Sequence, residues 1–555
     1  MKKVTFIIGT IIVLSGLWSS CGKDFLERVP ENEIPEVNFW KNDNDAYLAL
    51  NGIYNSLGKE VIYDDGATDN AHAQYQWESN ATFISQGTVT TDVNEGWDYN
   101  AIRRANYFLE NVDKVNMNDA LKARYKAEAR FLRAYYYCNL VNKIGDVPLV
   151  TKVLTAEGSY VPRDPRATVL NFILTELDEC AKVLPERYAG GGTDNGTHTE
   201  RGRATKGAAL ALKARMHLYN GQWQQAVDAA SAVMAIPGYD LFTVSSESGR
   251  DTQDNYAAWV NFTDAAEQRR FRLGLRSYEK LFIAANNNNK EVIFDRQLIK
   301  QRDDKSTTTF LLSADMGGWS SVTPTQELVN AYESFKTGLP VVPPSPAERA
   351  KRYAARETDP LFYEEYKNRD PRFYASILFD KSPWSNLEAN YVFKWIKGGS
   401  NRSRTGYNFR KLVDPDAWNE RINSYANTML LRFAEVLLTY AEAKNELSGP
   451  DATVYDAIDR IRVRAGMPVL DRAQYGTQDR LRTAIRRERR IELAVEGQRY
   501  MDIRRWKIAP DVMKTIMDLE NTPAQDRVWN DKLYLMPVPQ KERDLNPQLT
   551  QNSGY

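Results

Sequence analysis

The amino-acid sequence predicts a mostly α-helical protein, in which helical hairpins form a scaffold and a loop-rich remainder contains short strands. Two observations lead to this fold class. Apolar residues recur at helical spacing across residues 120–235 and again across 427–495. Between these stretches, residues 236–427 are rich in Gly, Pro, Asn and Trp, a composition typical of loops. At 555 residues the chain is long enough to bury a large core.

The first periodic stretch predicts four helices, over residues 120–141, 168–184, 204–219 and 223–235. Gly145 and Pro148 follow the first helix and end it. Asn220 and Gly221 separate the last two helices, which therefore form a hairpin. The alanines at 208, 209, 211 and 214 allow a neighbouring helix to approach closely, and Trp223 resembles a residue of tetratricopeptide units. Because the repeat period is not strict, we expect tetratricopeptide-like hairpins without a regular array.

The second periodic stretch predicts one long amphipathic helix that begins near Asn427 and continues past Tyr440, followed by helices over 455–464 and 481–495. In the loop-rich middle, residues 292–294 and 375–379 are expected to form short strands. The four prolines between 340 and 346 predict a surface loop. Irregular segments on a rigid scaffold are a common place for binding residues.

The N-terminus has the pattern of an export signal. Lys2 and Lys3 precede an apolar stretch over residues 4–18, shorter than the roughly 20 residues that span a bilayer. Ser19 and Ser20 lie directly before Cys21, so we expect residues 1–20 to be removed and Cys21 to be lipidated. Trp18 stands where a lipoprotein signal usually has an aliphatic residue. The competing interpretation is an ordinary signal peptide in which Cys21 is incidental.

The composition argues against several classes of protein. The 73 basic and 73 acidic side chains balance, whereas a nucleic-acid binder needs a net basic surface. Cys138 and Cys180 lie in helical patterns and are expected to be buried free thiols. His72, His198 and His217 are scattered, and no metal-ligand spacing, phosphate-binding loop or nucleophile elbow occurs in the sequence. Adjacent carboxylates are expected by chance, so nothing in the sequence indicates an enzyme.

Arginine is concentrated in residues 481–506, LRTAIRRERRIELAVEGQRYMDIRRW. In isolation this run could bind nucleic acid. However, Glu488, Glu492, Glu496 and Asp502 are interleaved with the arginines, and apolar residues keep helical spacing. The run therefore predicts a network of Arg and Glu side chains that joins helices.

The aromatic residues comprise 30 Tyr, 12 Trp and 20 Phe. Those at helical spacing, such as Tyr135, Tyr136, Phe433 and Tyr440, are interpreted as core. A second group lies beside polar or Gly residues: Tyr75, Trp77, Trp97, Trp259, Trp319, Trp384 and Trp395. An indole or phenol ring has a flat apolar face and a polar edge, which suits the face of a sugar ring. For any single one of them, burial in the core is the competing interpretation.

Several longer motifs add a family resemblance. They are NFWKNDNDAYLALNGIYNSL at 38–57, WDYNAIRRANYFLENV at 97–112, AEARFLRAYYYCNLVNKIGDVPLV at 127–150, TPTQELVNAYESFKTG from Thr323, RDPRF from Arg369, LLRFAEVLLTYAEAKNEL from Leu430, IDRIRVRAGMP from Ile458 and ERRIELAVEGQRYMDIRRW from Glu488. Because these motifs occur in this order and cover the chain almost from end to end, the chain resembles the SusD/RagB family of outer-membrane nutrient-binding lipoproteins.

The resemblance implies a SusD-like fold, with a signal peptide over 1–20, a region with tetratricopeptide-like helices over 21–235 and a RagB/SusD C-terminal region over 236–555. It implies a protein that is lipid-anchored at the cell surface in the outer membrane, that captures oligosaccharides and that delivers them to a TonB-dependent transporter of the SusC class. Some members bind peptides instead, and the family is not enzymatic. A surface glycoside hydrolase is a further, less favoured alternative. No cofactor is expected, and a structural Ca²⁺ is left open.

The quoted motifs are mainly scaffold, so they do not transfer a ligand site. The candidate site rests on loop aromatics and nearby hydrogen-bonding groups, namely Asp69, Asn70, Tyr75, Trp77, Trp97 and Trp319. Of these, Trp97 also belongs to a scaffold motif and has packing as its competing role.

Overall fold

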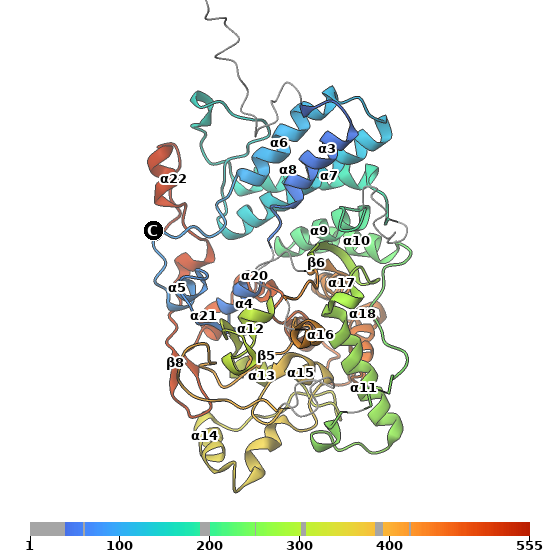
Figure 1. Ribbon diagram of the computed structural model, residues 1–555, viewed down its shortest axis with the longest axis vertical. Helices are drawn as coiled ribbons and strands as arrows, with labels where there is room; N and C mark the ends of the chain where they lie inside the picture. The colour runs from blue at the N-terminus through green and yellow to red at the C-terminus, as the bar shows by residue number, and fades with distance from the viewer. Residues whose placement is uncertain are drawn as a thin grey trace, which may run out of the picture.

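Helices form the framework of the chain, and short strand pairs lie between them (Figure 1). The computed structural model describes residues 39–58, 61–188, 200–249, 251–252, 254–300, 307–382, 392–420 and 423–555. Within these residues the strands form four two-stranded antiparallel sheets. The mostly α-helical fold class predicted from the sequence is confirmed.

The N-terminal helices pack in succession along the upper part of the molecule (Figure 1). They are α3 (Asp43–Tyr54), α6 (Asn100–Asn111), α7 (Asp119–Lys143), α8 (Arg166–Val183), α9 (Lys206–Tyr219) and α10 (Trp223–Met234). The four helices predicted for residues 120–235 are therefore confirmed to within a few residues. Gly221, with φ of +67°, makes the turn between α9 and α10.

Small residues let α9 pack closely, as predicted. Ala208, Ala209, Ala211 and Ala214 are all buried. At Gly207 a Cβ atom would lie 2.4 Å from the ring of Tyr239, so a side chain there would force the ring away. The close fit ties the hairpin to the chain that follows it.

The second helical group is α17 (Phe433–Ser448), α18 (Ala452–Arg464), α19 (Gln478–Glu492) and α20 (Gln498–Arg505). One prediction here was wrong: residues 428–432 are not helical. They form strand β6 (Thr428–Arg432), which pairs with β2 (Val292–Arg296). The physical reason is that β2 supplies hydrogen-bond partners for this backbone, and the apolar spacing of residues 429–433 fits either structure.

The middle of the chain contains more helix than its composition indicated. Helix α11 (Ala265–Glu279) is capped by Asp264, whose side chain accepts a hydrogen bond from the Glu267 N–H. Shorter helices are α13 (Gln326–Ala331), α14 (Pro346–Ala355) and α15 (Pro371–Ser376). At Gly274 a Cβ atom would lie 2.3 Å from the backbone of Ala465, so glycine allows α11 to cross the end of α18. The predicted strand over 375–379 is reduced to β4 (Ile377–Leu378).

Two hydrophobic cores hold these elements together. The first lies among α3, α6 to α10 and α17 to α19, and the second is formed mostly by residues of the middle segment, 256–418. Tyr135, Tyr136 and Phe433 are confirmed as core, and Tyr440 packs partly buried against it. Trp259 and Trp395, which the sequence placed near polar neighbours, are also buried in the second core. Cys138 and Cys180 are buried and free, as predicted.

A buried ion network joins the helices, as the Arg-rich run predicted. Glu492, the last residue of α19, is fully buried. It accepts hydrogen bonds from Arg372 at 2.9 Å, from Arg432 at 2.7 Å and from Arg464. Burial alone would raise the pKa of Glu492, but the three guanidinium groups hold it well below its usual range. One carboxylate thus connects α15, β6, α18 and α19.

The network extends to the neighbouring acids of the same segment. Glu488 accepts from Arg372 and from Arg462, and Glu496 accepts from Arg432 and Lys411. Because these side chains bond one another inside the fold, they are not available to a nucleic acid.

We expect Arg432→Met to lower the free energy of unfolding by about 3 kcal/mol or more, because it leaves Glu492 and Glu496 with fewer cations in a buried site. Chemical denaturation of the chain without residues 1–21 measures this. Lys182→Met is the matched control, since Lys182 is 68% exposed and its pair with Glu179 lies in solvent, so its loss should leave the stability nearly unchanged. Equal stability of the two variants would contradict the role given to the network.

A second prediction concerns the stability of the protein at low pH. Burial alone would raise the pKa of Glu279, but Arg410 and Arg276 lower it to about 2, from 4.5 in the unfolded chain. Between about pH 2 and pH 5, unfolding therefore takes up a proton at Glu279. The ionised Glu279 contributes about 3 kcal/mol to the free energy of unfolding at neutral pH, and this contribution is lost as the pH falls from about 5 towards 2. Denaturation midpoints across this pH range should show a shallower decline for Glu279→Gln. An unchanged slope in the variant would rule out this contribution.

Candidate functional site

The strand pair β1–β3 brings two distant loops together. β1 (Ala71–Ala73) is antiparallel to β3 (Val322–Pro324), with Ala73 opposite Val322. The chain that leaves β1 therefore lies beside the chain that enters β3, and the Gln74 N–H donates to the Ser321 carbonyl at 2.8 Å. Tyr75 and Trp77 of the first loop and Trp319 of the second are placed at the same end of the pair.

Tyr75 and Trp77 form an aromatic platform. Their ring centroids lie 4.7 Å apart with an interplanar angle of 28°, a stacked geometry. Trp77 is 80% exposed, while Tyr75 is partly buried beneath it. A tryptophan is usually largely buried, so Trp77 is unusual in presenting a large apolar ring face to solvent. Its contact with a ligand stays a prediction.

Asn401 holds the platform in place. Its backbone N–H donates to the Tyr75 hydroxyl at 2.9 Å, and that hydroxyl donates to the Asn401 Oδ1 at 2.8 Å. The Asn401 carbonyl accepts from the Ala314 N–H at 2.9 Å and from the Ser320 Oγ at 3.0 Å. Asn401 thereby fixes the Tyr75 ring to the loop that contains Trp319. It adopts a φ of +60°, which Asn tolerates better than most residues.

Polar groups border the platform. Arg402 and Asp315 form two hydrogen bonds of 2.7 and 3.0 Å, with side chains 24% and 39% exposed. Trp319 is partly buried and packs edge-on against Phe310, with centroids 5.8 Å apart. Aromatic faces with an accessible ion pair beside them provide both an apolar surface and hydrogen-bonding partners for a polyol.

Asp69 and Asn70 lie at the other end of β1 and are buried. The Asp69 carboxylate accepts two hydrogen bonds of 2.8 Å from Arg499 and pairs with Arg490 at 2.9 Å. Burial alone would raise the pKa of Asp69, but these two guanidinium groups hold it well below its usual range. Asn70 donates to Asp65 at 2.9 Å and accepts from Arg490 at 2.7 Å. In the structure both residues anchor the start of β1, and their contact with a ligand stays a prediction.

The remaining candidates lie apart from the platform. Trp97 is 7% exposed and belongs to the first core, next to Tyr99. Its packing role in the scaffold motif is what the structure shows, and ligand contact stays a prediction. Cys21 and Trp384 fall outside the described residues. The structure thus brings together Tyr75, Trp77 and Trp319 from the six candidates.

Sequence reasoning did not identify Asn401, Arg402 or Asp315. A signal was present: DMGGW at 315–319 and KGGSNR at 397–402 both contain paired glycines, and Gly317, Gly398 and Gly399 adopt positive φ. Two glycine-rich turns of this kind predict tight loops, but only the hydrogen bonds from Ala314 and Ser320 to the Asn401 carbonyl show that they meet.

Neither a metal centre nor a membrane span is found in the part of the chain that the structure describes. There, no three His, Cys, Asp or Glu side chains are grouped to hold a metal ion. None of the described helices combines the length and apolar character needed to cross a membrane.

Comparison with known proteins identifies the family. The model of the SusD family matches residues 281–555, and a model described as starch-binding associating with outer membrane matches residues 24–218. SusD-like protein P25 of Formosa agariphila is 27% identical over the full length of both chains. The starch-binding protein SusD of Bacteroides thetaiotaomicron is 24% identical, over 85% of this chain and 79% of its own.

Solved structures agree with this fold. A SusD-like protein of Bacteroides fragilis superposes with a TM-score of 0.77 at 28% identity, over 95% of this chain and all of its own. A SusD-like carbohydrate binding protein of the same species gives a TM-score of 0.75 at 28% identity, over 92% of this chain. Together with the motifs and the helical scaffold, these matches show that the chain belongs to the SusD/RagB family.

Proposed function

We propose that this protein is a non-catalytic, surface-exposed lipoprotein of the outer membrane. It binds oligosaccharides on the Tyr75–Trp77 platform and passes them to a SusC-like TonB-dependent transporter. Lipidation of Cys21 would provide the anchor. Support comes from the family and from relatives that are named as starch-binding or carbohydrate-binding. No cofactor is part of the proposal.

The exposed Trp77 is the observation on which the proposal depends. A sugar ring has an apolar C–H face and an equatorial rim of hydroxyls. The face can stack on the indole, while Arg402 and Asp315 can bond the rim. Because Asn401 holds Tyr75 rigidly under Trp77, little side-chain freedom is lost when a ligand binds.

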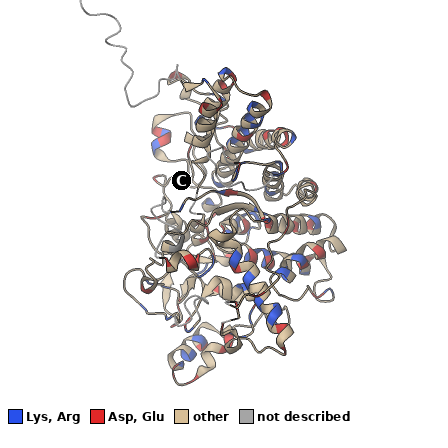
Figure 2. Ribbon diagram, turned by 45° about the vertical axis from the view of Figure 1, so that its right-hand side comes forward, with Lys and Arg blue, Asp and Glu red and all other residues tan. Residues whose placement is uncertain are grey.

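The charge distribution is also consistent with an uncharged ligand. Basic and acidic residues are interspersed over the ribbon (Figure 2). Without residues 1–20 the chain would lose two lysines and have 71 basic against 73 acidic side chains. A near-neutral surface of mixed sign offers no field that would attract a polyanion.

Trp77→Ala should weaken oligosaccharide binding by about tenfold or more, because the stacking face is lost. Calorimetry with the chain lacking residues 1–21 and a panel of oligosaccharides measures this, and the recovered sugars should be intact. Stability should change little, since Trp77 is 80% exposed. Tyr160→Ala, which removes a 52% exposed ring elsewhere, is the control and should bind as wild type. Equal affinities for Trp77→Ala and wild type would refute the platform.

Tyr75→Phe keeps the stacked ring but removes both hydrogen bonds with Asn401. We expect about three- to tenfold weaker oligosaccharide binding, because the platform becomes less rigid. Asn401→Gly should have a similar effect, since Gly tolerates the φ of +60° yet lacks the Oδ1. Titration calorimetry of both variants is the measurement. If both bind as wild type while Trp77→Ala does not, the platform is correct but Asn401 does not position it.

A further inference from the structure

Trp77 lies in a tight turn that has little support from the backbone. Within the described chain, residues 75–79 form one backbone–backbone hydrogen bond, from the Glu78 N–H to the Tyr75 carbonyl at 3.3 Å. Side-chain contacts therefore have to hold the turn in place. Asn401 provides such a contact at the first residue of the turn, Tyr75. The other end of the turn needs an anchor of its own.

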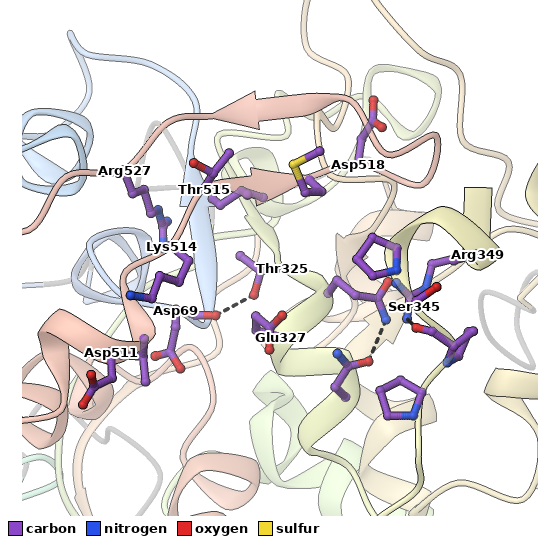
Figure 3. Close-up of a pocket in the computed structure, with 18 of the residues that line it drawn as sticks. Asp69, Thr325, Glu327, Ser345, Arg349, Asp511, Lys514, Thr515, Asp518 and Arg527 are labelled. Atoms are coloured by element: carbon purple, nitrogen blue, oxygen red, sulfur yellow. Dashed lines mark hydrogen bonds between the residues drawn. The ribbon is translucent and has the colours of Figure 1, made fainter. Parts of the chain in front are cut away.

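The strand that leads into this turn, β1, is fixed at its far end. There the Thr325 Oγ donates to the Asp69 carbonyl at 2.6 Å, beside a cavity of about 510 Å³ (Figure 3). The Asp69 carboxylate pairs in turn with Arg490 and Arg499. Because β1 is held in this way, the freedom of Trp77 depends on the contacts made by the turn itself.

Glu78 ends the turn, and Tyr63 holds it. Tyr63 belongs to α4 (Ile62–Gly66) and is 8% exposed. Its hydroxyl donates to the Glu78 Oε2 at 2.8 Å. The Glu78 Oε1 is shielded from solvent and has no hydrogen-bond partner among the described residues, and no cation of the described chain pairs with this carboxylate. The Glu78 carboxylate therefore depends on a single side-chain donor.

A carboxylate that is shielded from water is costly when its hydrogen bonds are lost. Without the Tyr63 hydroxyl, the Glu78 carboxylate would be more stable in water, and moving it there displaces the adjacent Trp77. The Tyr63 ring also packs edge-on against Phe310, with centroids 5.8 Å apart, and Phe310 packs against Trp319. Tyr63 thus contacts the turn directly and the Trp319 loop through one intervening ring.

We propose that Tyr63 is a positioning residue for ligand binding. Its hydroxyl holds Glu78, and Glu78 holds the turn so that the free face of Trp77 is ready to stack on a ligand. Tyr63 acts through the turn and does not touch the ligand. The inference rests on the proposed function, because it assigns Tyr63 a role in binding at the Tyr75–Trp77 platform.

Hydrogen exchange measured by mass spectrometry tests the anchor without any ligand, on the chain lacking residues 1–21. Tyr63→Phe keeps the ring contact with Phe310 and removes only the hydroxyl. The amides of residues 76–78 should then exchange about tenfold faster than in wild type, because the turn opens more readily. Equal exchange in Tyr63→Phe and wild type would overturn the inference.

Two further variants separate the anchor from a general loss of stability. Tyr63→Phe combined with Glu78→Met leaves no shielded carboxylate without a donor, so exchange at residues 76–78 should return to within about twofold of wild type. Tyr54→Phe is the matched control, since it removes a hydroxyl of α3 that donates to the Glu128 Oε2 at the same distance of 2.8 Å. It should leave exchange at residues 76–78 unchanged. A double variant that exchanges as fast as Tyr63→Phe would contradict the role of Glu78.

Calorimetry with maltohexaose, laminarihexaose and xylohexaose then measures the effect on binding. Tyr63→Phe should bind about fivefold more weakly than wild type, because a mobile Trp77 loses more freedom on binding, and the double variant should bind nearly as wild type. Faster exchange with wild-type affinity would overturn the positioning role. If wild type binds no oligosaccharide, the proposed function fails, whereas the exchange data still decide whether Tyr63 holds the turn.

Discussion

The rest of the structure depends on buried pairs between arginine and carboxylate groups. Glu492 connects α15, β6, α18 and α19 through three arginines. A few residues further on, Arg499 forms a bidentate pair with Asp69, 430 positions away in the chain. Buried charges are costly unless their partners are in place, so these pairs favour the arrangement in which the two parts of the chain supply partners to each other.

This constraint determines where binding groups can lie. With Asp69 held by Arg490 and Arg499, the start of β1 is fixed, and its pairing with β3 follows. The strand pair then has two ends with different chemistry. At one end Tyr75 and Trp77 present aromatic faces to solvent, and at the other a cavity opens beside the paired Asp69 and Arg490.

The features that could be predicted from the sequence are those that the spacing of neighbouring residues determines. Helices α7 to α10 were predicted because their apolar spacing is long and unambiguous. β6 was missed because the spacing of its five residues fits either a helix or a strand. They form a strand because they pair with β2, which lies over 130 positions away in the sequence. Asp69 and Asn70 were chosen as polar loop residues, yet their polar groups are used by arginines that lie 420 or more positions away. The placement of the Trp77 loop beside the Trp319 loop likewise depends on the long-range pairing of β1 with β3, which no local pattern contains.

The central claim is that rigid aromatic rings at one end of β1–β3 form the glycan-binding surface. The most direct test is a crystal structure of the chain lacking residues 1–21 with a bound oligosaccharide found by the binding panel. The account predicts a sugar ring stacked on the free face of Trp77, with hydroxyls bonded to Arg402 or Asp315. A bound oligosaccharide that leaves Trp77 in solvent and occupies another surface would contradict it.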